Sequence, residues 1–515
     1  MNTSLITLEI AVVVIGLLIL LLDLWAPAAA KSKLGYGAAM LLFLVLFYSF
    51  TDLVDGDGVR YAFGGMYVQD QLALYFKRFF IAAAIIVLVL SVEYSDRIKA
   101  GVSEFYALTL FALAGMMFAA SANDFALLFV SLELVTVTFY VLTSFLRSQT
   151  KSLESGVKYL ILGALSSAFM VYGIALIFGT TNTMNFGELQ KLTSAWATAG
   201  TLGDHKLMQL GLLMVFFGLA FKIAAFPMHV WAPDVYQGAP TPATAFLAVG
   251  SKAAGFVLVL RVLFGAAPAI AINWTVVLMI IAAVTILYGN LCAIPQRNLK
   301  RLLGYSSISN AGYILLGVAA ASVSGSSAVL YYLTGYLFTV LAAFGVLIVV
   351  VRQVDGDDIS SLSGLSQRSP FLAATMTIAM VSLAGIPPLA GFVGKFLLVK
   401  AVAEQAISNP SDPIMHPMAF IVIAVAIAGV VMSLYYYFGV VRAIYWSKDS
   451  SETTPITVSY PVKAMLATCV AAILYLGLFP GVPLTAGENA VSDLKLDTAV
   501  EVKQKVTGRV EHAKH

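Results

Sequence analysis

Four charged side chains lie inside long apolar stretches of this sequence of 515 residues. They are Glu133 in "NDFALLFVSLELVTVTFYVL", Lys222 in "LAFKIAAFPMHVWAP", Lys252 in "TAFLAVGSKAAGFVLVL" and Lys395 in "LAGIPPLAGFVGKF". A charge that faces lipid costs about 2.5–3.5 kcal/mol on insertion scales, so we expect all four to face the protein interior. Burial disfavours the charged form of either residue type, so these side chains are poised to gain and lose protons. Their types and positions suit a proton relay.

Prolines interrupt two of these stretches close to a lysine. Pro227 follows Lys222, and Pro387 and Pro388 precede Lys395. A proline removes a backbone donor and clashes with the turn before it, which leaves carbonyl groups of the preceding turn without helical partners. Free backbone groups are tolerated at membrane depth only where they are buried in protein or line a wet cavity. We therefore expect each break to give its lysine intermittent access to water.

Three further side chains are candidates for accessory roles. Thr136 and Tyr140 follow Glu133 at helical spacing and form a polar stripe that could hold water. His229 follows Pro227 and could pass protons between the broken helix and the cytoplasmic side. The simpler alternatives are that Thr136 and Tyr140 only bond to backbone carbonyls, and that His229 is an interfacial residue.

A structural interpretation of the four charges is also open, in which Glu133 neutralises one lysine and the pair only joins two helices. Two lysines beside helix breaks favour the relay. Glu9 in the first apolar stretch and Asp23 at its end lie outside this set, and we assign neither a transport role.

The composition indicates a helical membrane protein. The chain is 60% hydrophobic and 11% charged, whereas a soluble domain has about 25% charged residues. Its apolar runs are continuous and about 20 residues long, unlike the alternating segments of a membrane β-barrel. We predict an all-α polytopic fold of about fourteen spans, near 5–24, 34–50, 72–92, 104–121, 124–146, 157–178, 207–229, 242–264, 272–294, 302–322, 326–351, 371–403, 417–446 and 461–479.

The loops between the spans differ in charge. The acidic loop 51–58 contrasts with alternate loops rich in Lys and Arg, which include Lys31, Lys33, Arg97, Lys99, Arg147, Lys151, Arg297, Lys300, Arg301, Arg352, Arg368, Arg442 and Lys448. The basic side should be cytoplasmic, which places both termini outside; the basic tail (Lys503, Lys505, Arg509 and Lys514) does not follow this bias. The two broken spans are five apart, which indicates repeats of opposite topology.

Several chemistries have no motif here. Cys292 and Cys469 lie in separate spans without metal-ligand spacing, and there is no phosphate-binding or dinucleotide motif. A net charge of +3 does not suggest a nucleic-acid partner. We expect no redox centre and no ATP hydrolysis in this chain, so its driving energy should come from an ion gradient or a partner.

Three stretches, at 221–256 ("FKIAAFPMHVWAPDVYQGAPTPATAFLAVGSKAAGF"), 300–317 ("KRLLGYSSISNAGYILLG") and 382–396 ("SLAGIPPLAGFVGKF"), resemble the antiporter-like membrane subunits of proton-pumping NADH:quinone oxidoreductase, respiratory complex I or NDH-1. The resemblance runs from about residue 70 to 450. It is closest to the N-type (subunit 2) branch: the twelfth span carries Lys395 rather than glutamate, and 326–351 holds Tyr331, Tyr332 and Tyr336 but no histidine. The N-type branch also lacks the long lateral helix of the L type, and we expect only a polar tail after Pro480.

The resemblance implies two inverted five-helix repeats with spans seven and twelve broken. The chain would divide into an N-terminal three-helix segment (1–103), a first repeat (104–264, spans four to eight), a second repeat (265–446, spans nine to thirteen), and a final helix with a polar tail (447–515). It also implies that Glu133 pairs with Lys222, that Lys252 is the central lysine of the eighth span, and that Lys395 lies on the route to the outside.

The resemblance further implies partners and cofactors. The partners would be the M-type antiporter-like subunit, the small K-, J- and A-type subunits, the lateral helix of the L-type subunit, and lipids. No cofactor is expected in this chain, while NAD, FMN, iron–sulfur clusters and quinone would belong to partner subunits. The membrane would be a bacterial inner membrane, or a thylakoid-type membrane if the complex is photosynthetic.

Three alternatives stay open at this point. One is a subunit of a multisubunit Na⁺/H⁺ antiporter or membrane-bound hydrogenase. Another is a ferredoxin-driven photosynthetic NDH-1 complex. The third is a scaffold that only transmits force between subunits.

Overall fold

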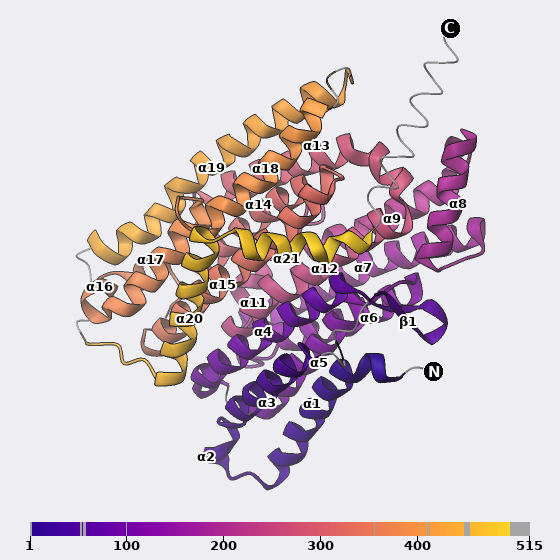
Figure 1. The fold of residues 1–515 in the computed structure, drawn as a ribbon. Coiled ribbons are helices and arrows are strands. Elements are labelled where there is room, and N and C mark those ends of the chain that lie inside the picture. Colours follow the sequence, from indigo (N-terminus) through magenta and orange to yellow (C-terminus); the bar gives the residue numbers. More distant parts are fainter. Residues whose placement is uncertain are drawn as a thin grey trace.

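The computed structural model describes residues 3–494 except 52–53, 55–57, 99, 355, 409, 411 and 447–453. Lys99, Lys448, the basic tail and part of the acidic loop at 51–58 therefore lie outside the described residues. Long helices run beside one another through most of the chain (Figure 1). Within the described part, twelve helices are long and apolar enough to cross a membrane, and two shorter apolar helices, α3 and α17, occupy the second and twelfth predicted places. The all-α polytopic class is confirmed.

The N-terminal segment contains three long helices, α1, α3 and α4, and a small β-hairpin between α3 and α4. Its elements are η1 (Thr3–Ile6), α1 (Thr7–Trp25), α2 (Ala28–Lys31), α3 (Leu34–Tyr48), β1 (Arg60–Ala62), η2 (Phe63–Gly65), β2 (Tyr67–Gln69), α4 (Gln71–Tyr94) and η3 (Ser95–Arg97). The strands are antiparallel, with Tyr61 opposite Val68. The sequence did not predict this hairpin, because three-residue strands carry too little alternation to be recognised.

The middle of the chain holds the first broken helix. Its elements are α5 (Val102–Ala120), α6 (Phe125–Thr143), α7 (Thr150–Thr181), α8 (Phe186–Ala199), η4 (Leu202–Asp204), α9 (Lys206–Ile223), α10 (Ala232–Gly238), α11 (Thr241–Phe246), the π-helical η5 (Leu247–Ser251), α12 (Lys252–Leu260) and the π-helical η6 (Arg261–Ala266). The predicted span 207–229 is therefore a helix that ends at Ile223, followed by an irregular segment and the short α10. The long connection near 179–206 contains α8.

The rest of the chain holds the second broken helix. Its elements are α13 (Pro268–Ala293), α14 (Leu299–Ala319), α15 (Val323–Gln353), η7 (Ile359–Leu362), α16 (Leu365–Arg368), α17 (Pro370–Ala384), α18 (Ala390–Ser408), α19 (Met415–Trp446), α20 (Tyr460–Leu478), α21 (Gly481–Val491) and η8 (Ser492–Leu494). The expectation of only a polar tail after Pro480 is wrong for its first part. There α21 packs on α4 and α15 and buries Ala490 and Val491, so a mixed sequence still forms a docked helix.

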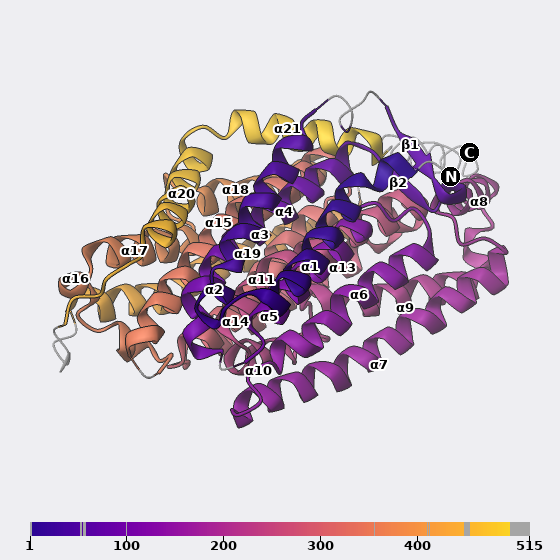
Figure 2. The same cartoon turned by 90° about the horizontal axis from the view of Figure 1, so that it is seen from below.

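Burial separates the inner helices from the outer ones. The eighth span, Thr241–Ala266, is 100% buried and α14 is 94% buried in their most apolar windows, whereas α7 and α19 reach 33% and 28%. Figure 2 shows α7 along one flank of the bundle, and the hairpin and α8 together at one end. Lys252, in the eighth span, is therefore enclosed by the rest of this chain, whereas α6, which carries Glu133, is only 50% buried in its most apolar window.

Candidate functional site

The first break places Lys222 at the end of a helix. Lys222 lies in the last turn of α9, and Ala224, with a left-handed φ of 56°, turns the chain out of the helix. A non-glycine residue in this conformation is strained, and such strain is typical of functional sites. The Phe221 carbonyl at this helix end accepts from the Ala224 N–H at 3.1 Å and from the indole nitrogen of Trp231 at 2.9 Å.

Lys222 is 4% exposed and contacts aromatic rings rather than a carboxylate. Its Nζ donates to the Tyr159 hydroxyl at 3.3 Å and lies 5.5 Å from the centre of that ring. Tyr159, from α7, stacks on Phe221 at 5.7 Å and packs against Trp231 at 4.9 Å. The ammonium group is thus held by a hydroxyl and a π face, which stabilise its charge less than a carboxylate does.

Glu133 faces α7 from α6 and is partly buried. It accepts a hydrogen bond from the Ser167 hydroxyl and interacts electrostatically with Lys222. No ion pair within 4.0 Å joins Glu133 to Lys222 among the residues that the structure describes. The direct pair that the resemblance implies is therefore not formed here: Ser167, which sequence reasoning did not single out, holds the carboxylate instead.

The accessory candidates differ in their surroundings. Thr136 donates to the Leu132 carbonyl at 2.6 Å, which is the simpler alternative for that residue. Tyr140 packs edge-on against Tyr159 at 5.3 Å, and its hydroxyl is buried without a hydrogen-bond partner. His229 lies in the break and is 3% exposed, and neither of its ring nitrogens has a hydrogen-bond partner.

Lys252 lies at the centre of the chain between two π-helical segments. It opens α12 directly after η5, and η6 begins at Arg261, directly after α12 ends. Its Nζ donates to the Ser307 carbonyl at 2.6 Å and also contacts the Ser307 hydroxyl. That hydroxyl lies 3.0 Å from the Tyr236 hydroxyl of α10, and the Tyr336 ring centre is 6.0 Å from the ammonium. Ser307 therefore links Lys252 to the second half of the broken seventh span.

Lys222 and residues of the eighth span, Ser251 among them, line a cavity of about 10 Å³. This volume is at the lower limit for one water molecule. Gly255 allows the close approach of the two helices, since a Cβ atom there would lie 3.1 Å from Lys222 Cβ and 2.7 Å from the Ile223 side chain.

The second break is closed by the lysine itself. α17 ends at Ala384, Gly385 takes a left-handed φ of 84°, and α18 begins at Ala390 after Pro387 and Pro388. Lys395, 5% exposed, donates to the Leu383 carbonyl at 2.7 Å and lies 4.8 Å from the centre of the Tyr313 ring. The ammonium thus satisfies a carbonyl that the break frees.

A polar network that sequence reasoning did not single out lies between Lys252 and the twelfth span. The Tyr332 hydroxyl donates to Asn310 Oδ1 at 2.8 Å, Asn310 donates to the Ser306 hydroxyl at 3.4 Å, and Ser306 contacts the Tyr437 hydroxyl. Tyr332 also lies against Gly394, next to Lys395: a Cβ atom on Gly394 would be 2.6 Å from its ring. The signal was present, since "YSSISN" at 305–310 is a polar run inside an apolar span.

Comparisons with known proteins identify the family of this chain. The family described as "NADH:quinone oxidoreductase/Mrp antiporter, TM" matches residues 122–409. NADH-quinone oxidoreductase subunit N of Desulforamulus reducens is 39% identical over 488 residues, which cover 95% of this chain and 98% of that protein.

Solved structures give the same picture. A chain of respiratory complex I from Thermus thermophilus with bound aureothin is 30% identical, with a TM-score of 0.73 and coverage of 93% of this chain and 99% of that chain. A chain of the Mrp complex from a Dietzia species has a TM-score of 0.79 at 20% identity, covering 98% and 100%, and so shares the fold. By its family match and by its identity to these relatives over nearly their whole length, the chain belongs to the family of subunit N of NADH-quinone oxidoreductase.

Proposed function

We propose that this chain moves protons through Glu133, Lys222, Lys252 and Lys395, driven by redox chemistry in partner subunits. One observation carries the proposal. The three lysine ammoniums are buried and contact hydroxyls, carbonyls and ring faces, and no carboxylate lies within 4.0 Å of them among the described residues. A buried charge that serves only structure is normally paired, as Arg261 is with Asp70.

The contacts suggest how the charges act on one another. The negative charge of Glu133 favours the protonated form of Lys222 when the carboxylate lies close to the ammonium. This effect is weaker when the hydrogen bond from Ser167 holds the carboxylate away from Lys222. A proton released from Lys222 Nζ could enter the small cavity that Lys222 and Ser251 both line. Lys252 would accept it, and the Ser306–Asn310–Tyr332 network leads from there toward the twelfth span.

The wider arrangement is part of the same proposal. The segments 104–264 and 265–446 would be inverted repeats, each containing one broken helix, with both termini on the outer side of a bacterial inner membrane. The M-type subunit, the K-, J- and A-type subunits and the L-type lateral helix would be the neighbours. NAD, FMN, iron–sulfur clusters and quinone would belong to other subunits, which supply the driving electron transfer.

The test is the number of protons pumped per electron in purified, reconstituted complex. Lys222→Met and Glu133→Gln should assemble yet lower this ratio, because each removes a proton-carrying group while preserving side-chain volume. Lys191→Met is the control, since this lysine on α8 is 75% exposed and pairs with Glu188 on the same helix. A normal ratio in assembled Lys222→Met would refute the relay and favour the force-transmitting scaffold.

A further inference from the structure

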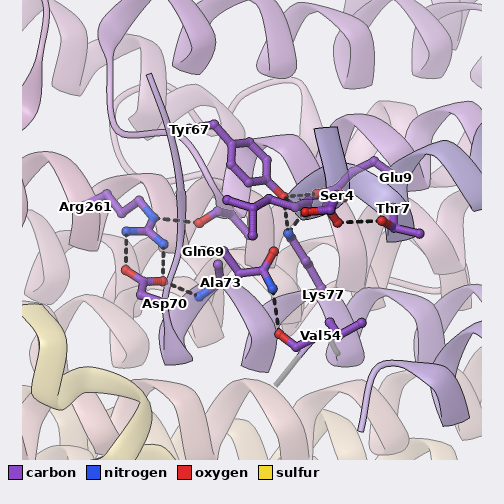
Figure 3. Close-up of polar contacts among 12 residues, drawn as sticks. Ser4, Thr7, Glu9, Val54, Tyr67, Gln69, Asp70, Ala73, Lys77 and Arg261 are labelled. Atoms are coloured by element: carbon purple, nitrogen blue, oxygen red, sulfur yellow. Dashed lines mark hydrogen bonds and ion pairs between the residues drawn. The ribbon is translucent and has the colours of Figure 1, made fainter. Parts of the chain in front are cut away.

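Arg442 of α19 is a cation whose charge has no partner in the described part of the chain. Other cations outside the relay are neutralised by acids. Figure 3 shows two of them: Lys77 Nζ lies 2.9 Å from Glu9 Oε1, and Arg261 donates to both oxygens of Asp70. Arg442 lies about one turn before the end of α19, and its exposed side chain makes no hydrogen bond or ion pair with any described residue.

Arg442 lines a pocket of about 750 Å³, which lies between the ends of α13 and α19 and the beginning of α14. Pockets for small molecules have volumes of about 300–1,000 Å³. No acidic residue is among the described residues that line this pocket, and most of its wall is apolar or aromatic, including Ile294, Leu302, Tyr435, Phe438 and Trp446. The pocket therefore suits a molecule that has both an anionic group and an apolar part.

The acids nearest in the sequence to the pocket wall have partners of their own. Asp357 and Asp358 precede Ile359, which lines the pocket. Asp357 pairs with Lys300 at 3.3 Å, and Asn298 donates to Asp357 at 2.5 Å and to Asp358 at 3.4 Å. Neither carboxylate therefore compensates the charge of Arg442.

The pocket lies at the depth of lipid headgroups. α19 has 32 residues and is therefore about 48 Å long, whereas the hydrocarbon core of a bilayer is about 30 Å thick. Arg442 is about 17 Å from the midpoint of the helix, just beyond the hydrocarbon if the helix is centred in the bilayer. Tyr435 and Trp446 at the pocket are both 71% exposed, and exposed tyrosine and tryptophan are enriched at this level of a membrane.

An apolar face of α19 continues from the pocket toward the middle of the helix. Its exposed residues follow one another at helical spacing, and they are Ile427, Val431, Tyr435 and Phe438. An acyl chain that lies along this face would start at the pocket, beside the guanidinium of Arg442. A free phosphate ion would use the arginine but none of this apolar surface.

We propose that this pocket binds an anionic phospholipid, with Arg442 donating to its phosphate oxygens and an acyl chain lying along the exposed face of α19. Arginine matches phosphate because its planar group offers two parallel N–H donors. Basic pockets between transmembrane helices are a recurring kind of lipid headgroup site. The site does not depend on the proposed relay, because none of the four relay residues lines the pocket.

Native mass spectrometry of the purified full-length chain, titrated in detergent with phosphatidylglycerol or with phosphatidylcholine, tests the site. The wild type should bind one phosphatidylglycerol more tightly than phosphatidylcholine. Arg442→Gln should weaken the binding of that lipid about tenfold or more, since it removes a charged donor to the phosphate. Arg297→Gln is the matched control: this exposed arginine makes no side-chain contact with a described residue, and it follows Gln296 of the pocket wall without lining the pocket itself.

Gly439→Trp provides a second test that keeps Arg442. Gly439 lines the pocket, and a Cβ atom there would have nothing within 4 Å, so the indole should fill the pocket without disturbing the fold. This variant should also lose the tightly bound phosphatidylglycerol.

Three results would overturn the proposal. The first is equal binding of the two lipids by the wild type, and the second is an equal loss of phosphatidylglycerol in Arg442→Gln and Arg297→Gln, which would indicate general attraction by surface charge. The third is a difference between wild type and Arg442→Gln that is seen in the isolated chain but not in the intact complex, which would assign the pocket to a neighbouring subunit. None of these readouts requires proton pumping, so failure of the relay and failure of this site are distinguishable.

Discussion

Substitution of Lys395 separates the role that its contacts show, closing a broken helix, from the role that we propose for it, carrying a proton. Its hydrogen bond to the Leu383 carbonyl, formed by a charged donor, is worth about 1.5–3 kcal/mol. Its position over the Tyr313 ring adds about 2 kcal/mol for a desolvated cation. Against this total of about 3.5–5 kcal/mol stands the cost of burying the ammonium, about 2.5–3.5 kcal/mol. Lys395→Met should therefore destabilise the fold by only about 0–2.5 kcal/mol.

The effect on transport should be much larger. Methionine fills the space but cannot bind a proton, and arginine keeps the charge and the donor but does not release its proton. Loss of a positioned proton-transfer group typically costs about 10²-fold or more in rate. Both Lys395→Met and Lys395→Arg should thus assemble in native gels and show strongly reduced proton pumping after reconstitution.

The paired variants make the reasoning refutable in two ways. Wild-type pumping in assembled Lys395→Arg would show that deprotonation of this residue is not required. Absence of the subunit from Lys395→Met complexes, with normal assembly of Lys395→Arg, would show that closing the break is its main role and that the energy balance above is wrong.

Two further substitutions test the packing around the sites. Gly391→Ala would place a Cβ atom 1.8 Å from the Ser382 carbonyl oxygen, so we expect the free energy of unfolding by denaturant in detergent to fall by at least about 1–3 kcal/mol. Gly439→Ala is the control and should be neutral, because a Cβ atom there would have nothing within 4 Å. Equal effects of the two substitutions would contradict the packing argument. Asp70→Asn should cost about 3–5 kcal/mol because it leaves the Arg261 charge buried and uncompensated. Adding Arg261→Met should recover most of this loss in the same denaturation assay, and a double variant as unstable as Asp70→Asn would show that the pair is not coupled.

The sequence was sufficient to predict features that depend on the free-energy cost of placing one residue type inside an apolar helix. A charge or a proline inside an apolar run is expensive wherever the helix packs, so the spans, both breaks and the burial of the three relay lysines could be predicted. The same rule applies to Lys77 and Arg261, which also lie in apolar runs and were overlooked.

The partners of these groups could not be predicted in the same way. Tyr159 is 63 residues from Lys222 in the sequence, and Ser307 is 55 residues from Lys252. Such contacts depend on how helices rotate and pack against one another, which hydropathy does not determine. The hairpin and α21 were missed because short or mixed segments become ordered only through tertiary contacts.

The position of Glu133 at the edge of the bundle has a practical consequence. Its neighbours on α6, Val130, Leu134 and Val137, are 62%, 40% and 54% exposed, so the carboxylate lies just behind a face of the chain that is free in the isolated subunit. In detergent, that face is covered by surfactant; in an assembly, it can be covered by protein. Measurements on the purified single chain would therefore report a Glu133 whose dielectric surroundings belong to the detergent, and biochemical work on this acid should be done in the intact assembly.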